Sequence, residues 1–246
     1  MQSEQIRVHR GEIEKSEEFI RFVCLSDTHN QVGKKFKVPD GDVLLHAGDF
    51  TNCGGTDDVV NFNNFLGRLP HRYKVVIAGN HDLSFDKENL PTLIRNFSLN
   101  PTINSDATKA LLTHCIYLEE TGVEVFGYKI WGSPWTPTFY DWGFNAERGS
   151  VIAEKWRKIP EDTEILITHG PPYAILDGCD DGFHAGCEEL KTAVERIKPK
   201  VHLFGHIHEA YGVYNNGFTH FINASTCTLR YRPTNPPIVF DLPRKS

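Results

Sequence analysis

The chain has 246 residues, 39% of them hydrophobic and 24% charged, with a formal net charge of −6 at pH 7. The negative net charge and the lack of a basic block argue against a long nucleic acid as partner. No apolar run approaches the roughly 18 residues of a membrane span, and residues 1–11 lack the apolar core of a signal peptide. We therefore expect a cytoplasmic protein with no membrane partner.

The first 18 residues differ in composition from the rest of the chain. They are charged and only weakly alternating, which predicts an N-terminal arm or an edge strand over residues 1–18. From residue 19 onward, short apolar runs alternate with turn residues, and there is no internal repeat or low-complexity linker. We therefore expect a single domain over residues 19–246.

Apolar runs in the first third of the chain predict three buried strands. They are Phe19–Leu25, Val43–Ala47 and Val75–Ala78. A helix is expected between the second and the third, with Asp57 or Asp58 as N-cap and Pro70 after its end. Its apolar face would comprise Val60, Phe62, Phe65, Leu66 and Leu69. Residues 86–97 predict a short helix interrupted near Pro91.

The middle of the chain predicts β-structure and then an aromatic loop. Ile116–Leu118, Val123–Phe126 and Lys129–Trp131 are short apolar runs separated by Gly-containing turns, which favours an antiparallel meander. Residues 131–144 form a loop rich in Trp, Phe and Tyr. A nucleobase could stack on this loop, and Trp135 is its candidate for lining a pocket, although packing on the sheet edge is the alternative.

The last part of the chain predicts two helices and further strands. Ile152, Trp156 and Ile159 mark one helix face, and residues 190, 194 and 197 mark another. Strands are expected at Glu164–Thr168, Val201–Phe204 and Ile238–Leu242, with a hairpin turning at residues 215–217.

Side chains of metal-ligating type follow five of the predicted strands directly. In chain order they are Asp27 and His29, Asp49, Asn80 and His81, His169, and His206 with His208. Open α/β sheets place ligands beyond the carboxyl ends of their strands. Imidazole nitrogens with carboxylate and amide oxygens suit Mn²⁺, Fe, Zn²⁺ or Co²⁺ better than Ca²⁺.

These ligands are too many for one tetrahedral ion, but they suit two ions that share a carboxylate. Two divalent cations beside two aspartates leave a surplus of positive charge that attracts a phosphate or a phosphodiester. Ions about 3.5–4 Å apart can stabilise an in-line displacement at phosphorus.

The order D-x-H, GD, GNH[DE], HG and GHxH resembles the calcineurin-like metallophosphoesterase superfamily. The longer strings at residues 46–50, 78–82, 168–172, 204–208, 223–226 and 236–241 are similar to the metallophosphoesterase-domain-containing (MPPED) group of class III phosphodiesterases. The resemblance runs from about Phe19 to Pro243. It implies an α/β fold, namely a four-layer αββα sandwich with two mixed β-sheets flanked by helices.

The resemblance also implies roles for individual residues. Asp27, His29, Asp49 and His208 would hold one metal ion, and Asp49, Asn80, His169 and His206 the other. The ions would be Mn²⁺ as first choice, with Fe, Zn²⁺, Co²⁺ or Mg²⁺ as alternatives. Asn80 would also bind the phosphate, and His81 would protonate the leaving oxygen. Some members of the group have Gly where this chain has His206, so we expect a complete second site.

A metal-bridging hydroxide would then attack a small phosphodiester, for example a cyclic nucleotide. One alternative is a phosphomonoesterase or protein phosphatase, but the segment 48–54 lacks the GDxVDRG string of Ser/Thr phosphatases and its Arg. The other alternative is a nucleotide-binding scaffold with little turnover.

Several nearby polar residues have both a functional and a structural interpretation. Asp82 or Asp86 could orient His81, or belong to a turn or the surface. Asn52 could contact phosphate or form an Asx turn, and His184 could reach the site or face solvent. His46, His114 and His202 lie in apolar runs and are expected in the core.

Overall fold

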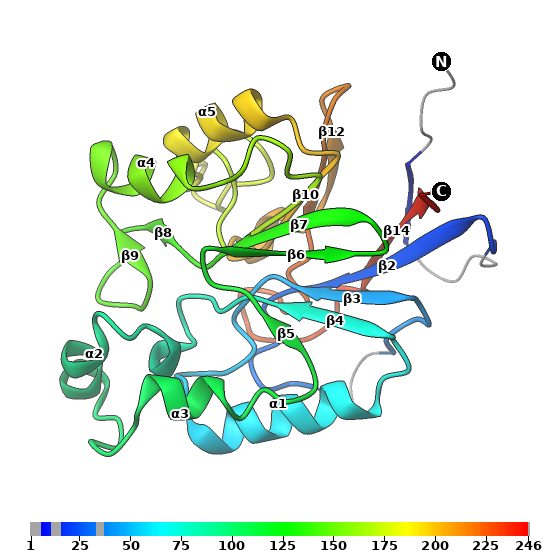
Figure 1. Cartoon of the computed structure of the whole chain (residues 1–246). Helices are drawn as coiled ribbons and strands as arrows, with labels where there is room; N and C mark the ends of the chain where they lie inside the picture. Colours follow the sequence, from blue (N-terminus) through cyan, green and yellow to red (C-terminus); the bar gives the residue numbers. More distant parts are fainter. Residues whose placement is uncertain (1–5, 11–15, 33–36, 246) are drawn as a thin grey trace.

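A computed structural model describes residues 6–10, 16–32 and 37–245 of the chain. Two six-stranded sheets lie face to face in the middle of the molecule, and helices cover their outer faces (Figure 1). The four-layer αββα arrangement predicted from the sequence is therefore confirmed.

The first sheet has the strand order β1-β14-β2-β3-β4-β5. Its strands are β1 (Arg7–Arg10), β14 (Ile238–Pro243), β2 (Phe19–Leu25), β3 (Val43–His46), β4 (Tyr73–Val76) and β5 (Ile116–Tyr117). Strands β2 to β5 are parallel, whereas β14 is antiparallel to both of its neighbours. Strand β1 lies at the edge of this sheet, within the segment 1–18 for which an N-terminal arm or an edge strand was expected. Residues 1–5 and 11–15 of that segment lie outside the described residues.

Three helices and a 3₁₀ turn accompany the first sheet. They are α1 (Thr56–Arg68), η1 (Leu83–Phe85), α2 (Leu90–Phe97) and α3 (Ser105–Lys109). Helix α1 buries Val59, Phe62, Phe65 and Leu66. These four residues share the apolar core on the outer side of the sheet with Val23, Leu25 and Leu44.

The second sheet has the order β12-β13-β11-β10-β7-β6. Its strands are β12 (Gly212–Asn215), β13 (His220–Asn223), β11 (Val201–Phe204), β10 (Ile165–Thr168), β7 (Tyr128–Ser133) and β6 (Thr121–Val125). The four central strands are parallel, and β12 and β6 are antiparallel edges. Helices α4 (Ser150–Arg157) and α5 (Glu188–Ile197) cover its outer face (Figure 1).

Two short strands, β8 (Thr136–Pro137) and β9 (Asn145–Ala146), form a separate pair, and η2 spans His208–Ala210. None of the helices in the described parts of the chain is long and apolar enough to cross a lipid bilayer.

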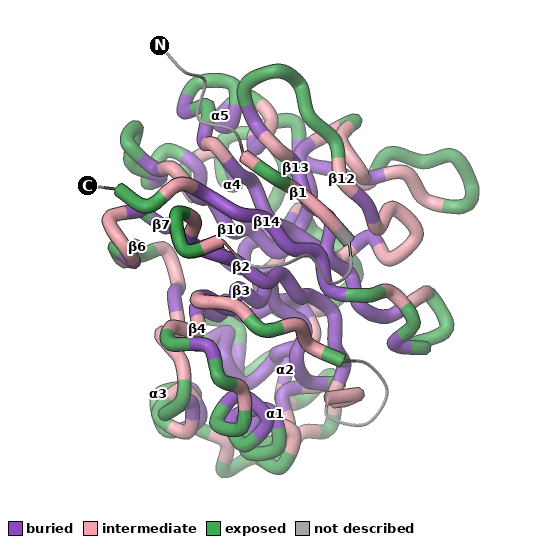
Figure 2. Tube along the Cα trace, turned by 90° about the vertical axis from the view of Figure 1, so that its right-hand side faces the viewer, coloured by how far each residue is buried: buried purple, intermediate pink, exposed green. Residues whose placement is uncertain are grey.

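The space between the sheets is filled by every second residue of the central strands. Phe22 and Cys24 of β2 share this core with Ile165 and Ile167 of β10 and with Leu203 of β11. The central strands are buried along most of their length (Figure 2). Burial on both faces explains why these strands are continuous apolar runs in the sequence.

Three predicted helix details are wrong. The N-cap of α1 is Gly55, and Asp57 and Asp58 lie in the first turn, where carboxylates interact favourably with the helix dipole. Val60 was expected on the apolar face but is 40% exposed. Pro91 does not interrupt a helix; it lies in the first turn of α2, where proline is tolerated because that N–H has no intrahelical partner.

The predicted three-stranded meander is also wrong in part. Only β6 and β7 form an antiparallel hairpin, because β5 pairs parallel with β4 in the other sheet. The chain passes from one sheet to the other between Tyr117 and Thr121. A local apolar pattern predicts a strand but not the sheet that it joins.

Candidate metal centre

The predicted ligands lie on loops that follow β2, β3 and β4 of the first sheet and β10 and β11 of the second. Four of them have a left-handed backbone, with φ of 50° at Asp27, 40° at His29, 55° at Asp49 and 68° at His206. This conformation is uncommon for residues other than glycine, and it clusters at functional sites.

The first group of candidate ligands consists of Asp27, His29 and His208, whose ligand atoms lie within 4.8 Å of one another. His208 Nε2 is 3.3 Å from Asp27 Oδ1, and His29 Nε2 is 3.3 Å from His208 Nε2. Asp27 and His29 are fully buried. Two imidazole nitrogens and a carboxylate therefore converge from both sheets.

The second group consists of Asp49, His169 and His206, again with ligand atoms within 4.8 Å. His169 Nε2 is 3.4 Å from Asp49 Oδ2 and 2.8 Å from Asn80 Oδ1. Asn80 is buried, so its amide oxygen belongs to the same cluster.

Asp49 connects the two groups. His29 Nε2 lies 3.8 Å from Asp49 Oδ2, and His29, Asp49 and His81 form a third group of the same compactness. His81 also donates its backbone N–H to Asp49 Oδ1 over 2.8 Å. The structure thus brings all eight predicted polar residues together around one shared carboxylate.

Three histidines of the centre are oriented by backbone carbonyls. The Nδ1 atoms of His169, His208 and His81 lie 2.8, 3.1 and 2.8 Å from the oxygens of Ala47, Thr228 and Asn52. A carbonyl only accepts, so Nδ1 donates and Nε2 is the nitrogen that faces the centre. Metal-ligating histidines are typically held in this way.

The side chains expected near His81 have other roles. The carbonyl of Asn52 holds the His81 ring, whereas the Asn52 side chain donates to Asp58. Asp86 was expected to orient His81, or to belong to a turn or the surface. It is buried, and the turn interpretation is correct, because Asp86 Oδ1 accepts from the backbone N–H of Asn89 at the turn over residues 87–89. The sequence did not indicate that Asp86 also accepts from the backbone N–H of Phe144 over 2.8 Å, in a loop far away in the chain.

Asp82 is a buried carboxylate that fastens the loops of the first sheet. It accepts hydrogen bonds from the backbone N–H groups of Asp49, Thr51 and Gly79 over 2.9, 2.9 and 2.8 Å, and from Thr51 Oγ1 over 2.7 Å. It neither orients His81 nor lies at the surface, but the turn interpretation is correct, because the Asp82 N–H also donates to the Gly79 carbonyl over 3.1 Å. The sequence feature that could have indicated this role of Asp82 is its position directly after residues 79–81.

Asn223 and Ser225 have a similar role on the second sheet. Ser225 Oγ donates to Asp27 Oδ2 over 3.0 Å, and Asn223 Nδ2 donates to the Ile207 carbonyl over 2.8 Å, between the two histidines of the GHxH loop. Asn223 Oδ1 accepts from the backbone N–H of Ser225. Both residues lie in the string 223–226, but the sequence did not indicate these contacts.

The electrostatics of the centre favour bound cations. Burial by itself would raise the pKa of Asp27, but the hydrogen bond and charge of His208, with the charge of His169, hold it below its ordinary value. Burial likewise opposes a charge on His169, yet the Asp49 carboxylate raises the pKa of His169 to about 9. Burial lowers the pKa of His29 to about 4 and of His206 to about 3. Two buried carboxylates therefore attract positive charge, as the raised pKa of His169 indicates.

The backbone around the centre also fits metal ions. A Cβ added to Gly79 would lie 2.3 Å from Asp49 Oδ1, and one added to Gly205 would lie 2.0 Å from Asp27 Oδ2. Only glycine lets the chain pass so close to the two carboxylates. The mixed nitrogen and oxygen donors suit divalent transition metals, so the residues present fit the two ions expected from the sequence.

The aromatic loop 131–144 contributes a ring to the centre, but it is not that of Trp135, for which the alternative of packing is correct. Trp135 is buried, packs against Phe144 with ring centroids 5.7 Å apart, and lies under the Lys155 ammonium. It belongs to the core because β8 begins directly after it. The ring that stacks on His81 is that of Trp142, at 3.9 Å, and the Tyr231 ring lies over His29 at 4.7 Å.

Four other histidines were interpreted from the sequence, and three of these predictions are correct. His46 and His202 are buried, and His184 lies at the surface beside Asp177. His114 is exposed rather than in the core, because it lies in the connection before β5 and not inside the strand.

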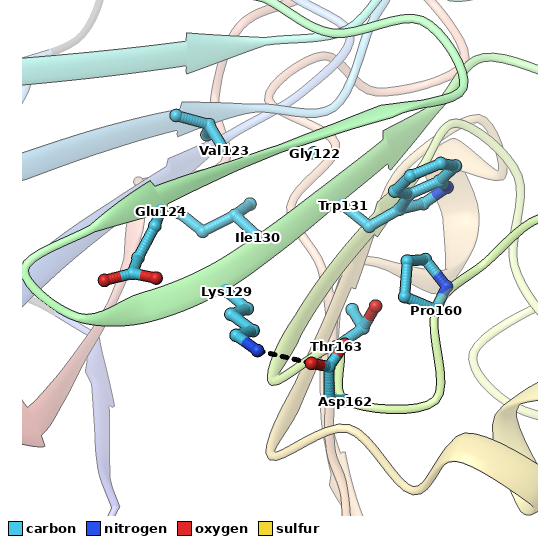
Figure 3. Close-up of a pocket in the computed structure, with 9 residues that line it drawn as sticks. All are labelled: Gly122, Val123, Glu124, Lys129, Ile130, Trp131, Pro160, Asp162 and Thr163. Atoms are coloured by element: carbon cyan, nitrogen blue, oxygen red, sulfur yellow. Dashed lines mark hydrogen bonds and ion pairs between the residues drawn. The ribbon is translucent and has the colours of Figure 1, made fainter.

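A separate cavity of about 240 Å³ lies on the β6–β7 hairpin (Figure 3). It is lined by Glu124, Lys129, Ile130, Trp131 and Asp162 among others, and the Lys129 ammonium pairs with the Asp162 carboxylate. None of its lining residues is a predicted ligand, so the metal centre is distinct from it.

The chain belongs to the calcineurin-like phosphoesterase family, whose pattern it matches over residues 20–210. This confirms the resemblance inferred from the motifs, and it makes the protein a metallophosphoesterase, an enzyme of the hydrolase class. The family uses divalent metal ions, in agreement with the clusters of His and Asp described above.

Individual relatives agree with this assignment. Metallophosphoesterase domain-containing protein 1 of Homo sapiens is 50% identical over 234 residues, which cover 92% of this chain and 72% of that protein. A 3′,5′-cyclic-nucleotide phosphodiesterase of Nostoc sp. is 24% identical over 77% of this chain and 64% of its own length. The crystal structure of phosphopantetheinyl hydrolase from Mycobacterium tuberculosis matches in fold alone, with a TM-score of 0.58 and 14% identity over 88% of this chain and 92% of that chain.

Proposed function

We propose that this protein is a phosphodiesterase that hydrolyses small phosphodiesters such as cyclic nucleotides. Asp27, His29, Asp49, Asn80, His169, His206 and His208 would hold two divalent cations, with Mn²⁺ as first choice. The observation that supports this proposal most directly is the position of Asp49, which lies within ligand distance of both histidine groups. One shared carboxylate is what a two-metal centre requires.

Two further observations favour a diester over a monoester. The segment 48–54 contains no Arg that could bind a dianionic monoester through two hydrogen bonds. The relative from Nostoc carries the name of a cyclic-nucleotide phosphodiesterase. A monoanionic diester needs less positive charge, which the cations of the centre would provide.

Bound divalent ions activate water and neutralise phosphate charge. The residues of this chain prepare that chemistry. Asn80 gives its amide oxygen to the centre and so leaves its Nδ2 group to donate to a phosphate oxygen. His81 uses Nδ1 to donate to Asn52, and the Trp142 ring stacks on it, so Nε2 faces the centre in a fixed plane. We propose that this Nε2 gives a proton to the leaving oxygen.

We also propose that residues 19–246 form one domain. Strand β14 supports this, because it completes the first sheet beside β2 although the rest of the chain separates the two strands. Arg21 and Asp241 join these strands through a buried bidentate ion pair with bonds of 2.9 and 2.8 Å.

The proposal is tested with protein purified in Mn²⁺, by comparing bis-p-nitrophenyl phosphate with p-nitrophenyl phosphate. A phosphodiesterase should give the higher kcat/KM on the diester. Preference for the monoester would instead support the phosphomonoesterase alternative. No hydrolysis of either compound would support the nucleotide-binding scaffold.

The role of His81 is tested by His81→Ala with a series of leaving groups. Because an acid matters most when the leaving oxygen is basic, the variant should lose activity mainly on diesters with poor leaving groups. It should retain both metal ions by elemental analysis. Loss of a metal ion would show that His81 acts as a ligand, which its distance to His29 and Asp49 also permits.

A further inference from the structure

An exposed aromatic side chain lies directly over the candidate metal centre. The Tyr231 ring is centred 4.7 Å from the ring of His29, 5.8 Å from that of His208 and 6.1 Å from that of His81. The residue is nevertheless 46% exposed. One part of the ring therefore packs on the centre, and the rest faces solvent at the entrance to it.

The backbone holds Tyr231 in this position at a conformational cost. Its φ is 53°, which is rare for a bulky residue. The backbone N–H of Tyr231 donates to the Thr228 carbonyl over 2.8 Å, and the Thr228 N–H donates to the Arg232 carbonyl over 2.9 Å. The same Thr228 carbonyl also accepts from His208 Nδ1. A single turn thus orients a candidate ligand and places an aromatic ring beside it.

The same turn borders a cavity. His208, Thr228, Leu229 and Arg230 line a space of about 420 Å³ together with residues 180, 209, 211 and 235. This volume lies within the range of small-molecule sites. A substrate whose phosphate occupies the centre therefore has room on the His208 side for an organic group.

We propose that Tyr231 determines specificity by stacking on a nucleobase carried by the ester group that stays on the phosphate. This proposal rests on the phosphodiesterase function proposed above and names the class of ester that the centre takes. An exposed, fixed aromatic ring stacks on any base through its π-face, and it gives a saturated alkyl group no comparable contact.

The test uses two diesters with the same leaving group. Thymidine 5′-p-nitrophenyl phosphate and methyl p-nitrophenyl phosphate both release p-nitrophenol, so the ratio of their kcat/KM values measures recognition of the retained group alone. Tyr231→Leu should lower this ratio about tenfold, and Tyr231→Phe should keep it. Tyr214→Leu is the matched control, because Tyr214 is 49% exposed on β12 and contacts none of the predicted ligands.

Binding gives a second measurement that does not depend on turnover. AMP and ribose 5-phosphate differ by the base, and calorimetry on the metal-loaded protein should show tighter binding of AMP. Tyr231→Leu should reduce that preference about tenfold, and its metal content should equal that of the wild type.

The outcomes separate this proposal from the proposed function. If both diesters are hydrolysed, and Tyr231→Leu changes neither their kcat/KM ratio nor the preference for AMP, the stacking role is wrong and the phosphodiesterase function stands. If neither diester is hydrolysed, the phosphodiesterase function is wrong. The AMP preference then decides alone: its loss in Tyr231→Leu supports stacking, and its persistence overturns it.

Discussion

The two sheets contribute different chemistry to one centre. The loops after β2, β3 and β4 supply both carboxylates, Asp27 and Asp49, together with the amide of Asn80. The loops after β10 and β11 supply only imidazoles, those of His169, His206 and His208. Asp27 pairs with His208 and Asp49 with His169, so each carboxylate of the first sheet meets a histidine of the second. Each sheet therefore holds only part of the set of candidate ligands.

The supports behind the ligands differ as well. A buried carboxylate, Asp82, fastens the loops of the first sheet, whereas an amide, Asn223, fastens the GHxH loop of the second. Each sheet also has a buried pair of His and Thr. In the first, His46 Nε2 lies 3.1 Å from Thr28 Oγ1, and in the second His202 Nε2 lies 2.8 Å from Thr168 Oγ1.

Replacing the shared carboxylate should have the largest effect, because it breaks the connection between the sheets. In Asp49→Asn, one oxygen of the buried carboxylate becomes an NH₂ group that cannot bind a cation. We expect a loss of more than about a hundredfold in kcat, since supporting residues alone typically account for 10–100-fold. Elemental analysis should show less metal per protein. Asp57→Asn, an exposed residue of α1, is the control, and equal activity of the two variants would contradict the assignment.

The two supports should differ in strength. Asp82→Asn replaces an acceptor of four hydrogen bonds, and its amide hydrogens oppose the N–H groups of Asp49, Thr51 and Gly79. We expect metal affinity to fall about 10–100-fold. Asn223→Ala should reduce it less, because the Ile207 carbonyl that it frees lies beside the ligands and not on one of them. Metal titration of both variants measures the difference, and a greater effect of Asn223→Ala would reverse the comparison.

The two His–Thr pairs should differ in their contribution to folding. His46 Nδ1 accepts from the backbone N–H of Gly48 over 3.3 Å, whereas His202 Nδ1 is buried without a hydrogen-bond partner among the described residues. His46→Phe leaves the Gly48 N–H unpaired and should lower the free energy of unfolding by about 1–3 kcal/mol. His202→Phe should cost about 1 kcal/mol less. Urea unfolding at pH 7 measures both, and equal losses would show that the Gly48 bond contributes nothing.

The smallest effect should appear in the pH dependence of stability. Burial lowers the pKa of His202 to about 3. The unfolded chain has an ordinary histidine pKa near 6.5, so between about pH 6.5 and pH 3 it binds a proton that the folded protein does not. His202 therefore makes the folded protein less stable as the pH falls through this window. Between pH 7.5 and pH 5.5, the free energy of unfolding of the wild type should fall by about 1 kcal/mol more than that of His202→Phe, which lacks the titrating group. An unchanged difference from the wild type between these pH values would show that His202 does not titrate in this way.

The sequence was sufficient to predict the eight polar residues of ligand type that the structure brings together at the candidate centre. Each ligand directly follows an apolar strand, and that pattern is local. The fold followed from the motifs that resemble the family. Contacts made by distant segments were not predictable in the same way. Asp82 resembled an ordinary turn residue, and nothing near Tyr231 in the sequence indicated that its ring covers His29, 202 residues earlier in the chain.

The same limit explains the errors in the fold. Residues 116–131 show three apolar runs, and only the pairing of β5 with β4 reveals that the first run joins another sheet. Trp135 and Trp142 belong to one aromatic segment, yet the first is in the core and the second stacks on His81. Composition places both in the same loop, and tertiary packing separates them.

The stack of Trp142 on His81 provides an intrinsic optical probe. Indole emission is sensitive to a charge close to the ring, and the ring centroids of Trp142 and His81 lie 3.9 Å apart. A cation bound beside His81 should therefore alter the fluorescence of Trp142, and Trp142→Phe identifies its share of the signal. Loading of the enzyme could then be followed in real time without attaching a dye.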